Sequence, residues 1–193
     1  MMKSNLFLLP NLITISRLLC IPLILVFYLS GIDNLKILSL IIFLYASISD
    51  FIDGYLARRL NQITLIGKIL DPIADKLLVI LTFMLFLTED FINILTITGI
   101  LIIIAREIAI MTIREIFAHQ NIQIDVIGLS KIKTTIQFIA LTLLFMTSLF
   151  ARDVIILLQL TNAAILFGAV ISLVTLVIYI RNINLILNKV TKK

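Results

Sequence analysis

Charged residues are scarce in this chain, and tryptophan is absent. Only 14% of the 193 residues are charged, whereas 61% are hydrophobic. Soluble domains are about one quarter charged and about half apolar. The mean hydropathy is accordingly high, at +1.19. The composition therefore excludes an ordinary soluble domain and predicts a membrane protein.

Cysteine and histidine are represented by one residue each. Because Cys20 is the only cysteine, an intramolecular disulfide, a cysteine-based metal site and a redox pair are excluded. His119 has no second histidine or cysteine at metal-ligand spacing. We therefore expect Cys20 to contribute only to helix packing, and we expect His119 to lie in a loop.

Uncharged apolar runs recur along the whole sequence, and about 20 such residues span a bilayer core. They predict six helices, near residues 12–30, 35–57, 68–88, 91–117, 132–151 and 154–181. No small-residue cleavage site follows the first run, so we expect a retained helix rather than a signal peptide. The predicted fold is an all-α integral membrane protein with six transmembrane helices, forming one domain over residues 1–193.

The basic residues predict the orientation of these helices. If the N-terminus is cytoplasmic, only Lys36 and Arg152 of the 16 basic residues lie near the outer loops. The positive-inside rule then places both termini in the cytoplasm. The net charge of +5 suits anionic lipid headgroups and requires no nucleic-acid partner.

Four aspartates, Asp50, Asp53, Asp71 and Asp75, lie inside or at the edge of apolar segments, in the stretch SDFIDGYLARRLNQITLIGKILDPIADKL. Ionisable residues in a membrane segment face a bundle interior or a watery cavity and indicate a functional site. The cluster therefore marks the first candidate site.

The spacing of these aspartates predicts two acidic helix faces. Asp50, Asp53, Gly54 and Ala57 are related as i, i+3, i+4 and i+7, whereas Gly67, Asp71 and Asp75 step by four. The connection from residue 59 to 66 is short, so we expect antiparallel neighbouring helices with opposed carboxylates near the cytoplasmic end.

Such a cluster suits a hard divalent cation, because Mg²⁺ and Mn²⁺ take oxygen ligands and bridge carboxylates to phosphates. Gly54, Ala57 and Gly67 would leave space for a nucleotide, and Arg58 offers a fork for phosphate oxygens. The alternative is that the aspartates form interfacial ion pairs and the glycines only allow close packing. We favour the metal site, because this arrangement is costly for packing alone.

The same stretch matches D-x2-D-G-x2-A-R-x8-G-x3-D-x3-D at every fixed position. It therefore resembles the signature of the CDP-alcohol phosphotransferase family of membrane enzymes. The resemblance implies that Asp50, Asp53 and Asp71 hold two Mg²⁺ or Mn²⁺ ions and the CDP diphosphate. It further implies that Asp75 is a metal ligand and the general base, and that Gly54, Ala57, Arg58 and Gly67 line the nucleotide.

Other segments resemble one branch of that family, the phosphatidylglycerophosphate synthases. The opening LPNLITISRLLCIP is similar to theirs, which implies that Asn11 and Thr14 lie near the nucleotide, although Thr14 could equally be helix filler. Pro10 suits a first helical turn and Pro22 a kink. In this branch CDP-diacylglycerol is the donor and glycerol 3-phosphate the acceptor.

An anionic acceptor needs cations, and two further segments supply them. IIIAREIAIMTIRE contains Arg106 and Arg114, about 80° apart around a helix, and SKIKTTIQ contains Lys131 and Lys133, about 200° apart. We expect these four residues to bind the acceptor phosphate. The separation of the two lysines leaves open whether one of them faces away from it. The alternatives are membrane anchoring for the lysines and a buried pair with Glu107 for Arg106.

Several other functions remain open at this stage. The same chemistry could use phosphatidylglycerol, as in cardiolipin synthase, or inositol phosphate or serine. A cation transporter is a remote alternative, because the aspartates cluster toward one membrane face and no inverted repeat is visible. We expect a multi-pass protein of the cytoplasmic membrane, with the active site facing the cytoplasm. The resemblance also implies a homodimer.

Overall fold

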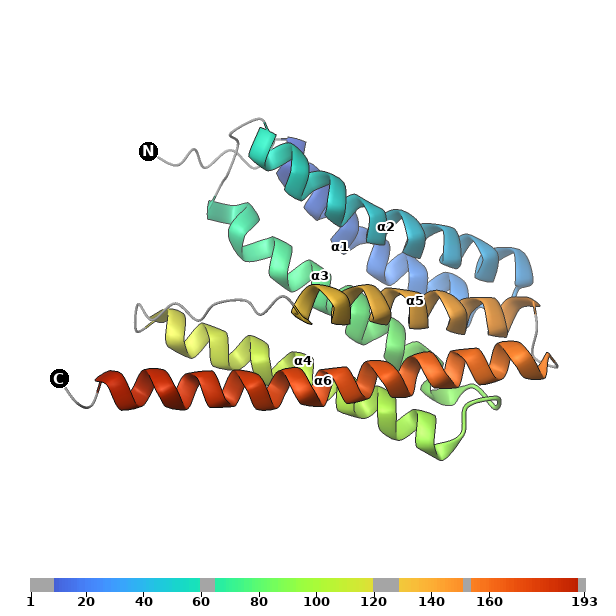
Figure 1. The fold of residues 1–193 in the computed structure, drawn as a ribbon. Coiled ribbons are helices and arrows are strands. Elements are labelled where there is room, and N and C mark those ends of the chain that lie inside the picture. The colour runs from blue at the N-terminus through green and yellow to red at the C-terminus, as the bar shows by residue number, and fades with distance from the viewer. Residues whose placement is uncertain (1–8, 60–64, 120–128, 151–153, 191–193) are drawn as a thin grey trace. The chain divides into compact units, whose positions relative to one another are not determined.

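The structure is a computed structural model that describes residues 9–59, 65–119, 129–150 and 154–190. Side chains are described for residues 11–49, 67, 70–117, 132–150 and 154–185. Six α-helices follow one another along the chain (Figure 1): α1 Leu9–Leu29, α2 Asp33–Arg59, α3 Leu65–Leu85, α4 Ile94–His119, α5 Leu129–Phe150 and α6 Ile155–Val190. A short 3-10 helix, η1 Phe86–Thr88, extends α3. The described ranges contain no strand, which confirms the all-α prediction.

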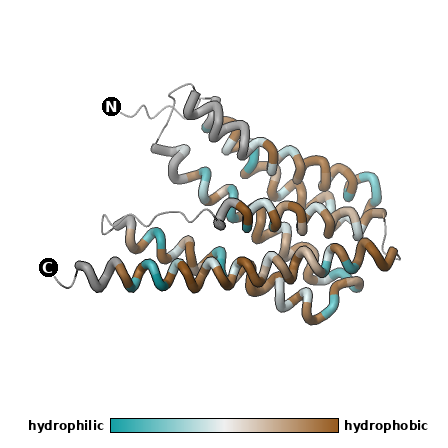
Figure 2. The backbone as a smooth tube through the Cα atoms, viewed as in Figure 1, coloured by the Kyte–Doolittle hydropathy of each residue, from teal (hydrophilic) through white to brown (hydrophobic). Residues whose placement is uncertain are grey.

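Four of the described helices, α1, α4, α5 and α6, contain a stretch that is long and apolar enough to cross a membrane. The apolar stretches run Asn11–Leu29, Ile94–Phe117, Ile132–Phe150 and Ile155–Leu185, and Figure 2 shows the apolar residues distributed along the helices. In contrast, α2 and α3 carry the predicted carboxylates and several basic residues. The protein is therefore a multi-pass membrane protein, while the count of six crossings stays a prediction.

The chain forms two compact units. The first contains Met1–Thr88 and Leu144–Arg152, and the second contains Glu89–Leu143 and Asp153–Lys193. In the first unit α1 packs along both α2 and α3, whereas α2 and α3 touch over a shorter length. In the second unit α4 packs along α6. This division does not test the prediction that the chain forms one domain.

The buried face of α1 changes character along the helix. Its N-terminal part buries the polar residues Asn11, Thr14 and Arg17, spaced by three. Its C-terminal part buries Cys20, Ile21, Ile24 and Tyr28. The helix thus brings polar groups to one end of its interface with α2 and α3, and an apolar surface to the other. The burial of Cys20 on this face confirms the prediction that it contributes to helix packing.

The two prolines of α1 occupy different positions in the helix. Pro10 is its second residue, as predicted for a first helical turn. Pro22 lies inside the helix, which continues to Leu29. A proline there has no backbone N–H to donate, yet the helix does not end at it.

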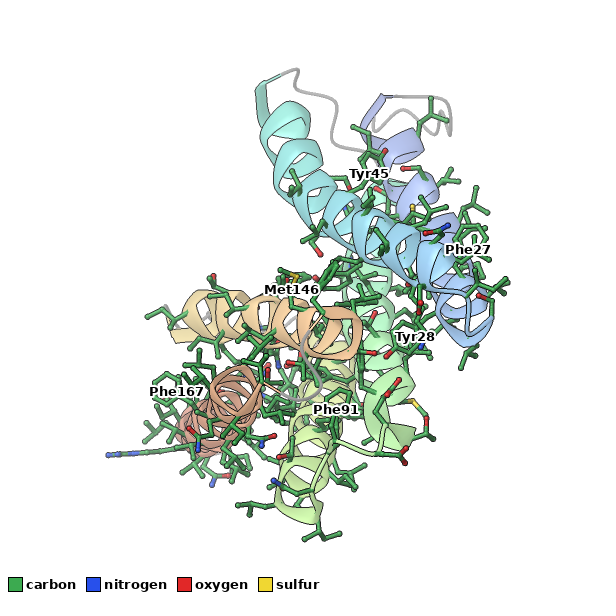
Figure 3. All side chains as sticks on the ribbon, turned by 90° about the vertical axis from the view of Figure 1, so that its right-hand side faces the viewer. Phe27, Tyr28, Tyr45, Phe91, Met146 and Phe167 are labelled. Carbon is green, nitrogen blue, oxygen red and sulfur yellow. The ribbon has the colours of Figure 1, made fainter. Side chains whose placement is uncertain are left out.

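An aromatic cluster closes the apolar end of the first unit. The Tyr28 ring, labelled in Figure 3, lies 5.0 Å from the Phe86 ring and 5.6 Å from the Phe145 ring, centroid to centroid. The Phe43 ring is 5.4 Å from that of Phe145. The Tyr28 hydroxyl also lies 2.6 Å from the Ser148 hydroxyl. These contacts join α1, α2, η1 and the end of α5 in one core.

The second unit depends on close approach between α4 and α6. Gly99 is buried, and a Cβ at this position would lie 3.2 Å from Ile165 Cγ2. One turn earlier, the Thr96 hydroxyl donates to Asn162 Oδ1 over 2.8 Å. Small residues and polar pairs of this kind hold membrane helices together, because lipid provides no hydrophobic driving force between them.

We predict that Gly99→Leu destabilises the protein by about 1–3 kcal/mol, because a new side chain overpacks the α4–α6 contact. The thermal midpoint in detergent measures this effect. Thr98→Leu is the matched control, since Thr98 is exposed on the neighbouring position of α4. Equal midpoints for the two variants would contradict the packing described here.

Candidate active site

Asp71, one of the predicted metal ligands, forms a hydrogen bond with a residue of another helix. The Thr14 hydroxyl on α1 donates to Asp71 Oδ1 on α3 over 2.5 Å. Thr14 is fully buried, and Asp71 is half-buried. A hydroxyl fixed in this way restricts the rotation of the carboxylate and leaves its other oxygen able to bind a further group. Thr14 therefore does more than fill space in the helix.

The α3 helix carries the second acidic face. It is continuous from Leu65 to Leu85, so Gly67, Asp71 and Asp75 follow one another at steps of four. Gly67 is buried, and Asp75 is partly exposed. Asp75 Oδ2 lies 3.3 Å from Lys76 Nζ. An ion pair of this exposure contributes little to stability, so it leaves the Asp75 carboxylate available for chemistry.

Pro72 directly follows Asp71 and lies inside α3. Its ring nitrogen has no hydrogen to donate, so the backbone carbonyl four residues earlier loses its usual helical partner. One backbone hydrogen bond of the helix is therefore missing beside the Asp71 carboxylate. Prolines inside membrane helices are tolerated where other groups satisfy the freed carbonyl.

The other half of the signature lies on α2. Asp50, Asp53, Gly54, Ala57 and Arg58 all belong to this helix, which continues to Arg59. The continuous helix supports the expectation that their i, i+3, i+4 and i+7 positions share one face. Their side chains lie outside the described part of the structure, so the opposed carboxylates stay a prediction.

The described residues can be tested for their fit to a divalent metal. Among them no group of three or more acidic, histidine or cysteine side chains comes together. Asp71 and Asp75 supply oxygen ligands one turn apart, and the hydrogen bond from Thr14 orients one of them. These features fit part of a binding site for a hard cation.

Arg17 is a buried cation that the sequence analysis did not select. Its side chain is completely buried in α1, one turn beyond Thr14. The spacing of polar residues along α1 contained a signal for it. Asn11, Thr14 and Arg17 follow each other at intervals of three in an apolar segment, and polar residues on one face of a membrane helix indicate a bundle interior.

A second polar cluster lies in the other unit, around the buried carboxylate of Glu107 on α4. Lys133 and Gln137 of α5 both donate to Glu107 Oε1, and the Gln137 bond measures 3.1 Å. Arg106 Nη1 lies 3.4 Å from the same oxygen. Arg106 Nη2 also donates to the Thr175 hydroxyl of α6 over 3.1 Å.

Two of the four predicted acceptor-binding residues belong to this cluster. Arg106 and Lys133 are buried side chains that share Glu107, so Lys133 does not have the position of a membrane-surface anchor. Arg114 is exposed two turns further along α4, with its guanidinium 5.8 Å from the centre of the Tyr179 ring. Lys131 is on α5, but its side chain lies outside the described residues.

Sequence reasoning considered Glu107 only as a partner for Arg106, and it missed Gln137 and Thr175. Glu107 and Gln137 are polar residues within apolar helices, which is the signal that was available. Their partners on other helices follow from tertiary packing and cannot be found from spacing along one helix.

These features define a class of protein: a multi-pass helical membrane protein that carries the aspartate signature on two helices and buried cations on three others. Residues 7–175 match the family model of CDP-alcohol phosphatidyltransferase. Because this match covers most of the chain, the protein belongs to the CDP-alcohol phosphatidyltransferase family and is a transferase. Members of this family generally depend on a divalent metal.

Several curated proteins are similar over most of their length. The chain is 40% identical over 141 residues to the CDP-diacylglycerol–glycerol-3-phosphate 3-phosphatidyltransferase of Rickettsia felis, covering 72% of this chain and 76% of the relative. It is 38% identical over 134 residues to the proteins of the same name from Wigglesworthia glossinidia brevipalpis and Salmonella typhimurium, covering 68% of this chain and 73% of each relative.

We predict that Thr14→Val raises the divalent-metal concentration needed for half-maximal transferase activity by about tenfold. Valine keeps the side-chain shape but cannot orient the Asp71 carboxylate, and loss of such supporting hydrogen bonds commonly costs 10-fold to 100-fold. Activity at varied Mg²⁺ and Mn²⁺ concentrations measures the change. Thr14→Ser should restore the metal response, and Thr98→Val is a matched control at an exposed position. An unchanged metal response in Thr14→Val would disprove the orienting role.

Proposed function

We propose that the protein transfers the phosphatidyl group of CDP-diacylglycerol to glycerol 3-phosphate, giving phosphatidylglycerophosphate and CMP. The observation that carries this proposal is the identity of 38–40% to relatives bearing the name of this reaction, over 68–72% of the chain. The buried Arg106 and Lys133 support it, because they provide cations for an acceptor that bears a phosphate.

In this proposal the metal site consists of Asp50, Asp53, Asp71 and Asp75, which hold two Mg²⁺ or Mn²⁺ ions. When bound, such ions neutralise phosphate oxygens and stabilise the charge that develops during phosphoryl transfer. The support from the described side chains is the oriented Asp71 carboxylate and the Asp75 carboxylate one turn away. Thr14 holds Asp71 in one orientation before substrate binds.

Asp75 acts as the general base on the acceptor. Its carboxylate takes the proton of the acceptor hydroxyl, and the hydroxyl oxygen forms a bond to the phosphorus of the phosphatidyl group. The bond from this phosphorus to the oxygen of CMP breaks, and CMP leaves with the electron pair. The partial exposure of Asp75 is consistent with this role, because a general base must reach its substrate.

The remaining predicted residues bind the two substrates. Gly54, Ala57 and Gly67 leave room for the nucleotide, whose phosphates Arg58 contacts, and Asn11 and Thr14 lie near it. Arg106, Arg114, Lys131 and Lys133 bind the acceptor phosphate. The burial of Asn11 and Gly67 in the first unit supports the first assignment. Arg106 forms the buried pair with Glu107 that the sequence allowed as an alternative, and the second assignment is supported by the two cations that share this one carboxylate.

We also propose a membrane arrangement for the whole chain. Six helices cross the bacterial inner membrane, both termini are cytoplasmic, the active site faces the cytoplasm, and residues 1–193 form one domain that associates as a homodimer. The four apolar helices support the membrane location. The distribution of basic residues supports the orientation, because it follows the positive-inside rule.

The test of the reaction is CMP release by the purified protein from CDP-diacylglycerol with Mg²⁺ or Mn²⁺. Glycerol 3-phosphate, phosphatidylglycerol, inositol phosphate and serine are offered separately as acceptors. We expect release with glycerol 3-phosphate alone. Release with another acceptor only would overturn the proposed acceptor and retain the metal site. Metal uptake into vesicles without CMP release would support transport instead.

We predict that Asp75→Asn lowers kcat by about 10²-fold to 10⁴-fold, because asparagine cannot accept the hydroxyl proton. Binding of CDP-diacylglycerol should be largely retained, since the other three aspartates remain. Steady-state kinetics and equilibrium binding separate the two effects. Asp90→Asn, at an exposed loop position, is the matched control. Normal turnover in Asp75→Asn would rule out the general-base assignment.

A further inference from the structure

Glu107 is a buried carboxylate that none of the proposed roles uses. It lies in the membrane-spanning stretch Ile94–Phe117 with 1% of its surface exposed. A carboxylate in such a place is unfavourable unless charged or hydrogen-bonding partners compensate its lost hydration. Its partners therefore decide what the residue does.

Three donors converge on one oxygen of this carboxylate. Lys133 Nζ, Gln137 Nε2 and Arg106 Nη1 all lie against Glu107 Oε1, the last two at 3.1 and 3.4 Å. Lys133 and Gln137 are one turn apart on α5, and Arg106 is the neighbour of Glu107 on α4. The carboxylate therefore fixes the distance between a lysine and an arginine on different helices.

The cluster still has capacity to bind an anion. Among the described residues, the Glu107 carboxylate and the two cations that contact it carry a net formal charge of +1. An arginine has five N–H donors. Arg106 uses Nη1 and Nη2 toward Glu107 and Thr175, and its buried Nε has no hydrogen-bond partner among the described residues.

We propose that Glu107 is a positioning residue for the acceptor phosphate, which holds Arg106 and Lys133 together in the arrangement that binds this group. The inference rests on the proposed function, which makes these two cations ligands of the acceptor. Without the negative charge of Glu107, two buried cations would repel each other and separate. Glu107 thus affects the acceptor through its neighbours.

The experiment compares Glu107→Gln with the wild type in separate titrations of glycerol 3-phosphate and CDP-diacylglycerol. We expect KM for glycerol 3-phosphate to rise at least tenfold and KM for CDP-diacylglycerol to change less than twofold. Glu107→Asp keeps the charge and should recover part of the loss. Glu115→Gln, an exposed residue two turns further along α4, is the matched control and should leave both constants unchanged.

A double-mutant cycle with Lys133→Met makes the test specific. If Glu107 acts by holding Lys133, Glu107→Gln should raise the acceptor KM much less in the Lys133→Met background than in the wild type. In the double variant only one buried cation, Arg106, lacks the negative charge of Glu107. The double variant therefore covers the case in which Glu107→Gln alone does not fold. Equal effects in both backgrounds would overturn the inference.

The remaining outcomes are distinct. Equal rises in both KM values, with no recovery in Glu107→Asp, would show a structural role only, and a lower acceptor KM would show that Glu107 competes with the phosphate. Wild-type turnover with glycerol 3-phosphate establishes the reaction independently of Glu107. An unchanged Glu107→Gln would then overturn this inference alone, whereas use of a phosphate-free acceptor by the wild type would overturn both.

Discussion

The cost of burying charge in a membrane protein governs both polar regions of this structure. A charged side chain away from water persists only when a partner compensates its desolvation. Asp71 is held by the Thr14 hydroxyl of another helix, and Glu107 is held by three donors on two helices. The contacts from Thr14, Lys133 and Gln137 also specify which helices lie together, because each joins two different helices.

The two polar regions contain different sets of charged groups. The first unit carries carboxylates on α3 and, by sequence, on α2, which suits metal cations and through them a diphosphate. The second unit surrounds one carboxylate with two cations, which suits an anionic group directly. The chain keeps these two polar regions on different helices.

Much of the fold follows from hydropathy and spacing, because these report properties of single helices. Every predicted apolar segment corresponds to one α-helix, and most boundaries agree within a few residues. The largest difference is α6, predicted to end near residue 181 and observed to continue to Val190. Hydropathy reports burial in lipid, whereas the backbone hydrogen bonds of a helix can continue into polar sequence. The helical steps of the aspartates were predictable for the same reason.

Contacts between helices were not predictable, because spacing gives the angle between two residues on one helix but not the direction in which either faces. The 200° separation of positions 131 and 133 left their roles open. The structure resolves this for Lys133, whose side chain meets Glu107 on α4. Gln137, one turn further along α5, meets the same oxygen and confirms which side of α5 faces α4. The α5 cation observed beside Glu107 is therefore Lys133, and this contact follows from packing between two helices rather than from spacing along one of them.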